Sequence, residues 1–340
     1  MRKNKYFTCP LDQDQTPPQT GEFLFRLGYD NDMRLSLRKY QNNADGEKIR
    51  QYLREIYLLQ ERREIGWPVY RWDYWRWHVN ENIFRFNLSA AVFLWETTEG
   101  RLAAVLHPDG AGETFLQVHP DFHTPELDVE MISAAETQFA VMQVGGNQRL
   151  TVWAHESDLL RQNLLTRRGY SRCGHPEYQR RREMSQTIPE VPTPEDYTIR
   201  ALGELDEHPA RSWVSWKAFH PNEPDKTYQG WEWYSNVQRA PLYRRDLDLV
   251  AVAPSGEFAA FCTLWFDELT STAAFEPVGT HPDHRRRGLG KALMAEGLRR
   301  ARDLGSTLCT VGSYSEAAGA LYASVGFTQY DLNEPWVKEW

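Results

Sequence analysis

The sequence has few cysteines and no long apolar run. The first argues against a cysteine-based metal site, and the second against a membrane-spanning helix. Its four cysteines, Cys9, Cys173, Cys262 and Cys309, lack the close spacing of metal-binding pairs. No stretch approaches the roughly 18 to 20 apolar residues of a membrane span, and the N-terminus lacks the apolar core of a signal peptide. We therefore expect a cytoplasmic protein in which Cys262 and Cys309, set in apolar runs, fill the core.

Excess positive charge is also absent. The formal net charge of the 340 residues is -8, which argues against general binding to nucleic acid or a membrane surface despite basic runs at 180–182 and 285–287. Apolar residues make up 41% of the chain and aromatic residues 13%, which is enough for two folded cores. We expect a two-domain protein that is monomeric or homodimeric.

One basic, glycine-containing turn is the most informative motif present. Residues 285–290 read Arg-Arg-Arg-Gly-Leu-Gly, between an extended segment, 273–280, and a helical pattern that ends near Gly305. Gly288 and Gly290 have no Cβ atom to keep an anion from the backbone, and the first N–H groups of a helix lack internal partners. The turn therefore suits a phosphate, although an ordinary turn with solvated arginines fits the same residues.

A second motif follows it. After a short extended run, 306–311, the residues Ser313-Tyr314-Ser315-Glu316 have the form of a capping box that begins a helix. That helix carries Leu321 and Tyr322 and stops at Gly326-Phe327. The order and separation of the two motifs make a more specific signal than either alone.

Together the motifs resemble the GNAT superfamily of N-acetyltransferases. Arg285-x-x-Gly288-x-Gly290 is similar to that family's acetyl-CoA pyrophosphate loop, and residues 318–327, ending in Leu-Tyr-x-x-x-Gly-Phe, are similar to its second signature. The resemblance covers residues 197–340. It implies an α/β (α+β) fold with a mixed, mostly antiparallel twisted sheet flanked by helices, acetyl-CoA as cosubstrate and no metal.

The resemblance also implies roles for individual residues. Tyr322 matches the tyrosine that donates a proton to the coenzyme sulfur, and Glu276 is the candidate base, two residues after Ala274, where several relatives carry glutamate. A solvated or structural Glu276 fits equally well. Contacts to the cosubstrate are implied for Val278, Gly279, Thr280, Arg285, Arg286, Arg287, Gly288, Leu289, Gly290, Lys291, Ser315 and Ala318.

Two departures from simple expectation stand out in this region. Ser315 occupies a position where the family commonly has asparagine, but serine still donates and accepts hydrogen bonds. His281 and His284 flank Pro282-Asp283, and without further ligands at suitable spacing we interpret them as loop histidines rather than as metal ligands.

The first half of the chain reads as a degraded copy of the second. Trp75-x-Trp77-x-x-Asn80 echoes Trp231-x-Trp233-x-x-Asn236 at an offset of 156 residues. Further echoes follow in the same order, namely Gly100 with Gly256, 118–121 with 280–283 at an offset of 162, and Gly169-Tyr170 with Gly326-Phe327 at an offset of 157. Their order and small drifts indicate tandem duplication.

The differences between the copies assign their roles. Where the second copy has Arg285, Gly288 and Gly290, the first has His123, Glu126 and Asp128, and Leu165 replaces Tyr322. Carboxylates would repel a pyrophosphate. We therefore expect the first copy to be structural or to shape the substrate site, and the second copy to be catalytic. This arrangement resembles the tandem architecture of mycothiol synthase.

The copies and their elements can be placed along the chain. We expect an N-terminal extension at 1–31, a degenerate GNAT-like domain at 32–185, a proline-rich linker at 186–196 and the catalytic domain at 197–340. An amphipathic helix at 46–62 should bury Ile49, Leu53, Ile56 and Leu59. The tryptophan-rich segment 67–77 is more consistent with packing than with a ligand cleft. Expected strands are 90–95, 101–106, 113–118, 197–200, 248–253, 258–266 and 273–280, and expected helices are 126–139, 205–219 and 230–239.

The expected function is transfer of an acetyl group from acetyl-CoA to a primary amine by direct attack. The sequence leaves the acceptor open among a small amine, an aminoglycoside-like antibiotic, an amino-sugar conjugate and a protein N-terminus. A non-catalytic acyl-CoA sensor and a transferase of another acyl group are the alternatives. An intact loop together with Tyr322 favours an enzyme, because a sensor needs no proton donor at the sulfur.

Overall fold

The computed structural model describes residues 34–340, so the predicted extension at 1–31 and Cys9 lie outside the described residues. The described chain forms two compact units, and each is discontinuous in sequence. The first unit comprises residues 34–68, Ile83–His175 and Asn333–Trp340. The second comprises Val69–Asn82 and Pro176–Leu332.

The first unit is built on a mixed sheet. Its strands lie in the order β1-β2-β3-β4-β6-β14, and all neighbours are antiparallel except β4 and β6. The strands are β1 (Leu35–Lys39), β2 (Phe93–Thr97), β3 (Leu102–Gly110), β4 (Glu113–Val118), β6 (Gln148–His155) and β14 (Gln329–Glu339), with short β5 (Val141–Met142) and β7 (Ser171–Arg172) beside them. The helices are α1 (Asn43–Leu59), α3 (Leu88–Ala91), α4 (Pro125–Phe139) and α5 (Leu159–Arg167).

The second unit repeats this plan. Its strands lie in the order β9-β10-β11-β12-β13-β8, and only β12 and β13 are parallel. The strands are β9 (Thr198–Ala201), β10 (Asp248–Val252), β11 (Phe258–Asp267), β12 (Thr272–Thr280), β13 (Leu308–Ser313) and β8 (Glu177–Glu183). The helices are α2 (Val69–Tyr74), α6 (His208–Phe219), α7 (Tyr234–Val237), α8 (Leu289–Asp303) and α9 (Glu316–Ala323), and a π-helical segment, η1 (Trp75–Phe84), follows α2. The predicted mixed, mostly antiparallel fold is confirmed.

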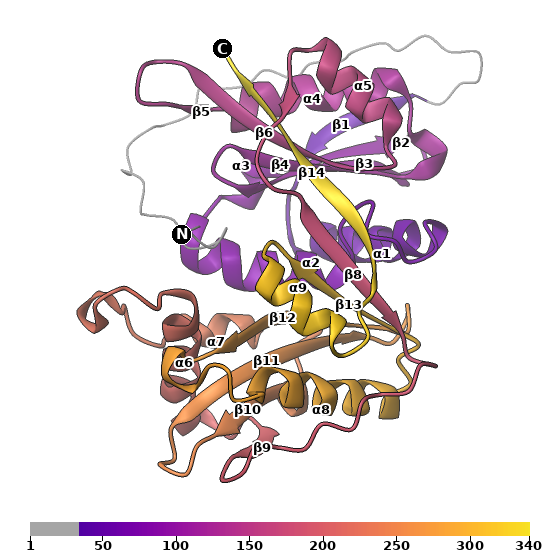
Figure 1. Ribbon diagram of the computed structural model, residues 1–340. Coiled ribbons are helices and arrows are strands. Elements are labelled where there is room, and N and C mark those ends of the chain that lie inside the picture. Colours follow the sequence, from indigo (N-terminus) through magenta and orange to yellow (C-terminus); the bar gives the residue numbers. More distant parts are fainter. Residues whose placement is uncertain (1–33) are drawn as a thin grey trace. The chain divides into compact units, whose positions relative to one another are not determined.

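Helices cover both faces of the second unit's sheet, as strand alternation on β11 shows. Helix α8 lies along the sheet (Figure 1). Cys262 and Leu264 of β11 lie in the same apolar core as Leu293 of α8. Their neighbours point the other way: Phe261 and Thr263 contact Arg211 of α6, and Trp265 contacts Tyr74 of α2. The period of two in β11 therefore separates an α8 face from an α2/α6 face.

A strand from the other half of the sequence completes each sheet. β8 precedes the proline-rich segment 186–196, yet it pairs with β13, with Arg180 opposite Val311. Residues 333–339 of β14 end the chain, yet they pair with β6, with Trp336 opposite Val152. The predicted domain boundary at residue 185 thus describes the order of the copies along the chain. The compact units differ from the copies because each unit takes its last strand from the other copy. Residues 187–194 form neither strand nor helix.

Several local predictions are corrected by tertiary contacts. Helix α1 buries Tyr52 and Tyr57 together with Ile49, but Leu59 at its last position is 55% exposed. The predicted helix 230–239 shrinks to the four residues of α7, and Gly230, with a φ of +96°, lies outside it. The packing interpretation of the tryptophan segment is confirmed for Trp67, Trp72 and Trp75, which are at most 2% exposed.

Candidate active site

The site begins where the parallel pair β12–β13 separates. Ladder pairing joins residues 272–275 of β12 to 308–311 of β13 and does not extend to Val278. β12 remains paired on its other edge, with Val278 opposite Cys262 and Thr280 opposite Ala260. Within the described residues, the β13 ladder therefore does not reach Val278, Gly279 and Thr280. Free backbone groups along a strand edge can bind an extended ligand that carries amides.

The basic turn leads from this edge into α8. Gly288 is the N-cap residue with φ 80° and ψ 0°, a left-handed conformation that favours glycine, and no side chain caps the helix. Arg286 and Arg287 are exposed, and Arg285 donates from Nη2 to the Ala218 carbonyl at 3.0 Å. The first N–H groups of α8 thus point out of the helix into a positively charged turn, as an anion site requires.

Gly290 has a second function that the sequence did not indicate. A Cβ atom there would lie 3.2 Å from Cδ2 of Leu321 on α9. Gly290 therefore permits the close approach of α8 and α9. At Gly288, by contrast, the nearest heavy atom to an added Cβ is Cγ of Pro194, at 4.0 Å, so that side of the turn is open.

Helix α9 starts two residues later than the capping-box prediction. The N-cap is Ser315, whose Oγ accepts from the Ala318 N–H at 3.3 Å, so the assignment of the cap to Ser313 is wrong. Ser313 is still part of β13, where it pairs with Tyr178 of β8. The ladder holds Ser313 in the strand, and this places Ser315 at the mouth of the β12–β13 opening.

Tyr322 and Glu276 share one electrostatic environment. Tyr322 is 7% exposed, and burial first, then the negative charge of Glu276, raises the pKa of its phenol, which is therefore protonated at neutral pH. The carboxylate of Glu276 also raises the pKa of Tyr74, which burial raises most. The Trp265 indole donates to the Glu276 carbonyl at 2.6 Å and so fixes the strand beside the carboxylate.

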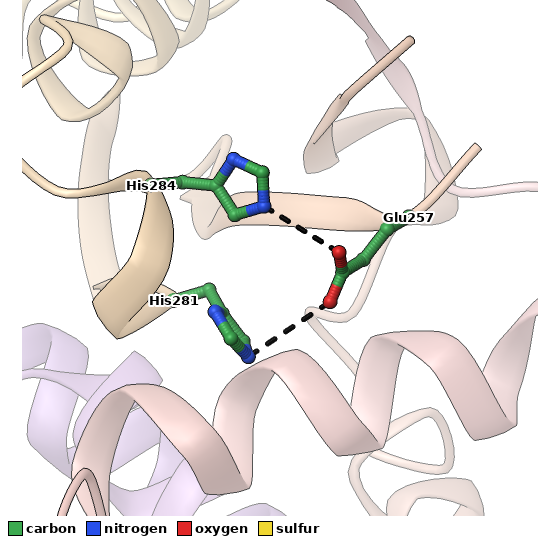
Figure 2. A group of neighbouring side chains, drawn as sticks. All are labelled: Glu257, His281 and His284. Carbon is green, nitrogen blue, oxygen red and sulfur yellow. Dashed lines mark ion pairs between the residues drawn. The ribbon is translucent and has the colours of Figure 1, made fainter. Parts of the chain in front are cut away.

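The two histidines of the loop meet a glutamate (Figure 2). The Nε2 atoms of His281 and His284 lie 3.9 and 3.5 Å from carboxylate oxygens of Glu257, so the three side chains are close enough for a shared ion. However, His281 Nδ1 accepts from the Asp283 N–H at 3.3 Å, which leaves the proton of the neutral ring on Nε2. That proton occupies the position that a metal ion would need, so we interpret the group as a loop support.

The same turn occurs in the first unit, which supports this interpretation. There His119 Nδ1 accepts from the Asp121 N–H at 3.1 Å. His119 corresponds to His281 at the offset of 162, whereas Glu257 is replaced by Arg101 at the offset of 156. The feature that both copies keep is therefore the histidine cap of the turn.

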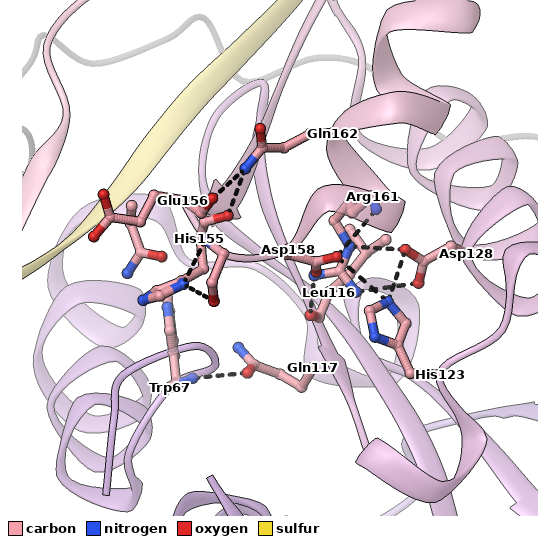
Figure 3. A network of polar contacts seen from close by, with 12 residues as sticks. Trp67, Leu116, Gln117, His123, Asp128, His155, Glu156, Asp158, Arg161 and Gln162 are labelled. Carbon is pink, nitrogen blue, oxygen red and sulfur yellow. Dashed lines mark hydrogen bonds and ion pairs between the residues drawn. The ribbon is translucent and has the colours of Figure 1, made fainter. Parts of the chain in front are cut away.

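In the first unit an arginine fills the corresponding opening (Figure 3). Pairing of β4 with β6 ends at Phe115 and Trp153, and the next carbonyl, that of Leu116, accepts from Nη1 of Arg161 at 3.1 Å. Leu116 corresponds to Val278 at the offset of 162, and Arg161 to Ala318 at the offset of 157. A guanidinium thus bonds to the first-unit carbonyl that corresponds to Val278 of the second unit.

Carboxylates hold this guanidinium in place. Asp128 accepts from Nε and Nη2 of Arg161 at 3.0 and 3.1 Å, and Asp158, the N-cap of α5, lies 3.4 Å from Nη1. His123 Nε2 lies 3.2 Å from Asp128. Burial alone would raise the pKa of Asp128, but the charge of Arg161 and bonds from His123 and Arg161 lower it to about 2. Asp128 and Asp158 correspond to Gly290 and Ser315.

Sequence reasoning missed the residues that approach this region from the first half. Tyr74, whose pKa is raised by burial and then by the charge of Glu276, belongs to the second unit although it lies far from 197–340 in sequence. The echo of Trp75–Asn80 in Trp231–Asn236 was the one available signal. It showed that the segments are equivalent, and it did not show that they pack together, as Asn82 does with Asn236 at 2.8 Å.

Comparisons with known proteins agree with this geometry. The model of the Acetyltransferase (GNAT) family matches residues 205–327. Mycothiol acetyltransferase from Salinispora arenicola is 32% identical over 251 residues, which cover 69% of this chain and 77% of the relative. The chain belongs to the GNAT acetyltransferase family. It is therefore an acyltransferase, and the recognition drawn from the two motifs is confirmed.

Other GNAT relatives extend the match to the tandem architecture. A mycothiol acetyltransferase from Paenarthrobacter aurescens is 25% identical, covering 70% of this chain and 73% of the relative. The GCN5-related N-acetyltransferase of Sphaerobacter thermophilus shares the fold with a TM-score of 0.63 at 17% identity, covering 90% of this chain and 95% of that one. A tandem GNAT protein from the clavulanic acid biosynthesis pathway does so with a TM-score of 0.58 at 16% identity, covering 90% and 98%. Both copies of this chain thus have the fold of the family.

Within residues 34–340, none of the helices combines the length and the apolar character needed to cross a bilayer.

Proposed function

We propose that this GNAT protein transfers an acetyl group from acetyl-CoA to a primary amine of a small molecule, by direct attack and within the second copy. The observation that carries the proposal is the β12–β13 opening. The uncapped start of α8 follows β12 in the chain, and the charge of Glu276 on β12 acts on the buried Tyr322 of α9. Relatives named mycothiol acetyltransferases support an acetyl group and a small acceptor.

The residues around the opening fit the parts of acetyl-CoA. Backbone groups of Val278, Gly279 and Thr280 would pair with the pantetheine amides. The pyrophosphate would lie on the α8 N–H groups among residues 285–291, with Ser315 and Ala318 on the facing side of the opening. When bound, the cosubstrate supplies an activated acetyl thioester. The exposed turn and the open space at Gly288 fit such a group.

Two side chains would move protons during the transfer. Glu276 accepts the proton that the ammonium of the acceptor must lose before its nitrogen can attack the carbonyl carbon. As the new carbon–nitrogen bond forms, the carbon–sulfur bond breaks, and Tyr322 donates its phenolic proton to the departing sulfur. The raised pKa of Tyr322 keeps that proton in place until the sulfur becomes basic. Water returns Tyr322 and Glu276 to their starting states.

Release of free CoA thiol over a panel of primary amines tests the proposal. We expect Tyr322→Phe to lower kcat by about 10²- to 10⁴-fold, the usual contribution of a positioned acid, while the affinity for acetyl-CoA is unchanged. Tyr330→Phe is the matched control, because Tyr330 is 47% exposed and has no role in the mechanism.

Three results would contradict parts of the account. Wild-type turnover in Tyr322→Phe would show that Tyr322 is not the proton donor to the sulfur. A clear preference for propionyl-CoA or a longer thioester would show that the transferred acyl group is not acetyl. Tight acetyl-CoA binding without thiol release for any amine would contradict amine transfer.

A further inference from the structure

Strand β8, which precedes the linker in sequence, places an arginine beside the helix that carries Tyr322. Arg180 lies on β8 opposite Val311 of β13, and its Nε donates to Oγ of Ser313 at 3.2 Å. Its Nη2 lies against α9, because a Cβ atom added to Gly319 would be 2.7 Å from it, closer than a real Cβ atom approaches. Gly319 lies one turn before Tyr322 on α9, so the two positions share one side of the helix. The guanidinium is thus next to the part of α9 that carries the proposed proton donor.

Local stability does not account for this cation. Arg180 is half-buried, and within residues 34–340 no carboxylate forms an ion pair with it. The rings of Tyr178 and Tyr330 flank the guanidinium, with centroids 5.4 and 5.1 Å away, and hold it without neutralising its charge. The dipole of α9 disfavours a cation near the start of the helix, and glycine inside a helix is less stable than alanine. Gly319 and Arg180 together therefore keep a positive charge where stability alone would not place one.

The first copy lacks this arrangement at the corresponding positions. Ala154 corresponds to Val311 at the offset of 157, and the residue opposite Ala154 in the ladder is Glu334. An acidic residue thus occupies the position that Arg180 has in the second unit. The residues of α9 are also replaced, Gly319 by Gln162 and Tyr322 by Leu165. The copy that has the tyrosine therefore also has the arginine and the glycine that admits it, and the other copy has none of the three.

Proton donation turns Tyr322 into an anion in a buried place. Burial, and then the negative charge of Glu276, raise the pKa of Tyr322, whereas the charge of Arg180 lowers it. A thiol of the cysteine kind has a pKa of about 8.5, so transfer of a proton from such a phenol to a thiolate is unfavourable. A nearby guanidinium makes the transfer less unfavourable, because it attracts the phenolate that forms.

We propose that Arg180 is a positioning residue for the transfer and acts through Tyr322, because its charge stabilises the phenolate left when Tyr322 protonates the departing sulfur. The carbon–sulfur bond breaks, its electron pair goes to the sulfur, and the sulfur takes the phenolic proton. The negative charge is then on the Tyr322 oxygen, near the guanidinium, until water returns a proton. The inference rests on the proposed acetyl transfer, and it makes a strand of the first copy part of the catalytic machinery.

Removing the charge while keeping an aliphatic side chain tests the role of Arg180. Thiol release from acetyl-CoA is measured with whichever of ethanolamine, glucosamine and glycinamide the wild type acetylates fastest. We expect Arg180→Met to lower kcat by about tenfold with the KM for acetyl-CoA unchanged, because one nearby charge is lost from the transition state. Arg180→Lys, which keeps the charge, should restore part of the loss. The control is Arg302→Gln, which removes a surface cation that pairs with Asp303 and should keep the wild-type kcat.

A double-mutant cycle separates an action through Tyr322 from a structural role. In the Tyr322→Phe background we expect Arg180→Met to cause no further fall in kcat, because no phenolate forms there. Wild-type kcat in Arg180→Met, an equal fall in both backgrounds, or a loss seen as a higher KM for acetyl-CoA alone would each overturn the role of Arg180 and leave the transfer reaction intact. No thiol release by the wild type over the wider panel of primary amines would instead overturn the transfer and this role together.

Discussion

The two copies contain the same opening and use it in opposite ways. In the second copy the parallel strands separate, the β13 ladder does not reach Val278, and the start of α8 is exposed and uncapped. In the first copy the strands also separate, but Arg161 donates to the Leu116 carbonyl and is held by Asp128 and Asp158. The fold provides the opening in both copies, and a few side chains decide whether the protein or a ligand occupies it.

This difference is concentrated at corresponding positions. Asp128 stands at the position of Gly290 and Asp158 at that of Ser315, and each now helps to hold the arginine. The first copy thus has an internal ion network at the positions where we propose that the second copy binds an external anion. Because the network is buried and satisfied by hydrogen bonds, it stabilises the first unit only while all its members are present.

Introducing the first copy's charge into the second should have the largest effect. We expect Gly288→Glu to abolish measurable acetyl-CoA binding, because a carboxylate would face the pyrophosphate at a short distance. Isothermal titration calorimetry measures the affinity, and circular dichroism checks the fold. Gly288→Asn is the matched control, because asparagine tolerates the φ of 80° without adding charge and should bind far better. Equal losses in the two variants would show that backbone strain is responsible.

Removing the guanidinium of the first copy should have the next largest effect. We expect Arg161→Ala to lower the free energy of unfolding by about 3 to 5 kcal/mol, because Asp128 and Asp158 would be left buried without their cation. Urea unfolding followed by tryptophan fluorescence measures the change. The double variant Arg161→Met with Asp128→Leu replaces the pair by apolar groups and should lose less. A single variant as stable as the double one would show that the network has no special role.

The pH dependence provides a second control on the same network. The pKa of Asp128 is lowered from 3.8 to about 2 in the folded chain, so the unfolded chain binds more protons between these values. The stability that Asp128 contributes is therefore present above about pH 4 and is lost as the pH falls towards 2. The stability gap between the wild type and Asp128→Asn should shrink over this range. A stability difference between the two proteins that is constant from pH 6 to pH 2 would show that the charge of Asp128 does not contribute to stability.

Local sequence patterns predicted most of the elements that surround the site. The expected strand 113–118 is β4 without change, and the helix after Gly288 buries Leu289, Leu293 and Ala301 as its period indicated. These predictions are confirmed because burial of one face of a helix or strand requires apolar residues at the period of that element. Leu59 is an exception, because the helical period does not show where the packing of other residues against α1 ends, and Leu59 is exposed.

Features that depend on distant partners could not be predicted in the same way. The exchange of β8 and β14 leaves no trace in either strand, because ladder hydrogen bonds join backbones whatever their side chains. For the same reason the sequence predicted packing for segment 67–77 without showing that Tyr74 lies beside Trp265. Ser313 was mistaken for the cap because its pairing with Tyr178 is a tertiary contact. The basic turn on which the cosubstrate prediction depends could be recognised because its residues, 285–290, are consecutive in the sequence.

A crystal structure of the protein grown with acetyl-CoA tests the central claim most directly. The account predicts one cosubstrate per chain, with its pyrophosphate at the start of α8, its pantetheine along residues 276–280 of β12 and its sulfur near Tyr322. Arg161 should remain bonded to Leu116 and Asp128 in the same crystal. A cosubstrate bound at β4 with Arg161 displaced, or an empty opening between β12 and β13, would contradict the account.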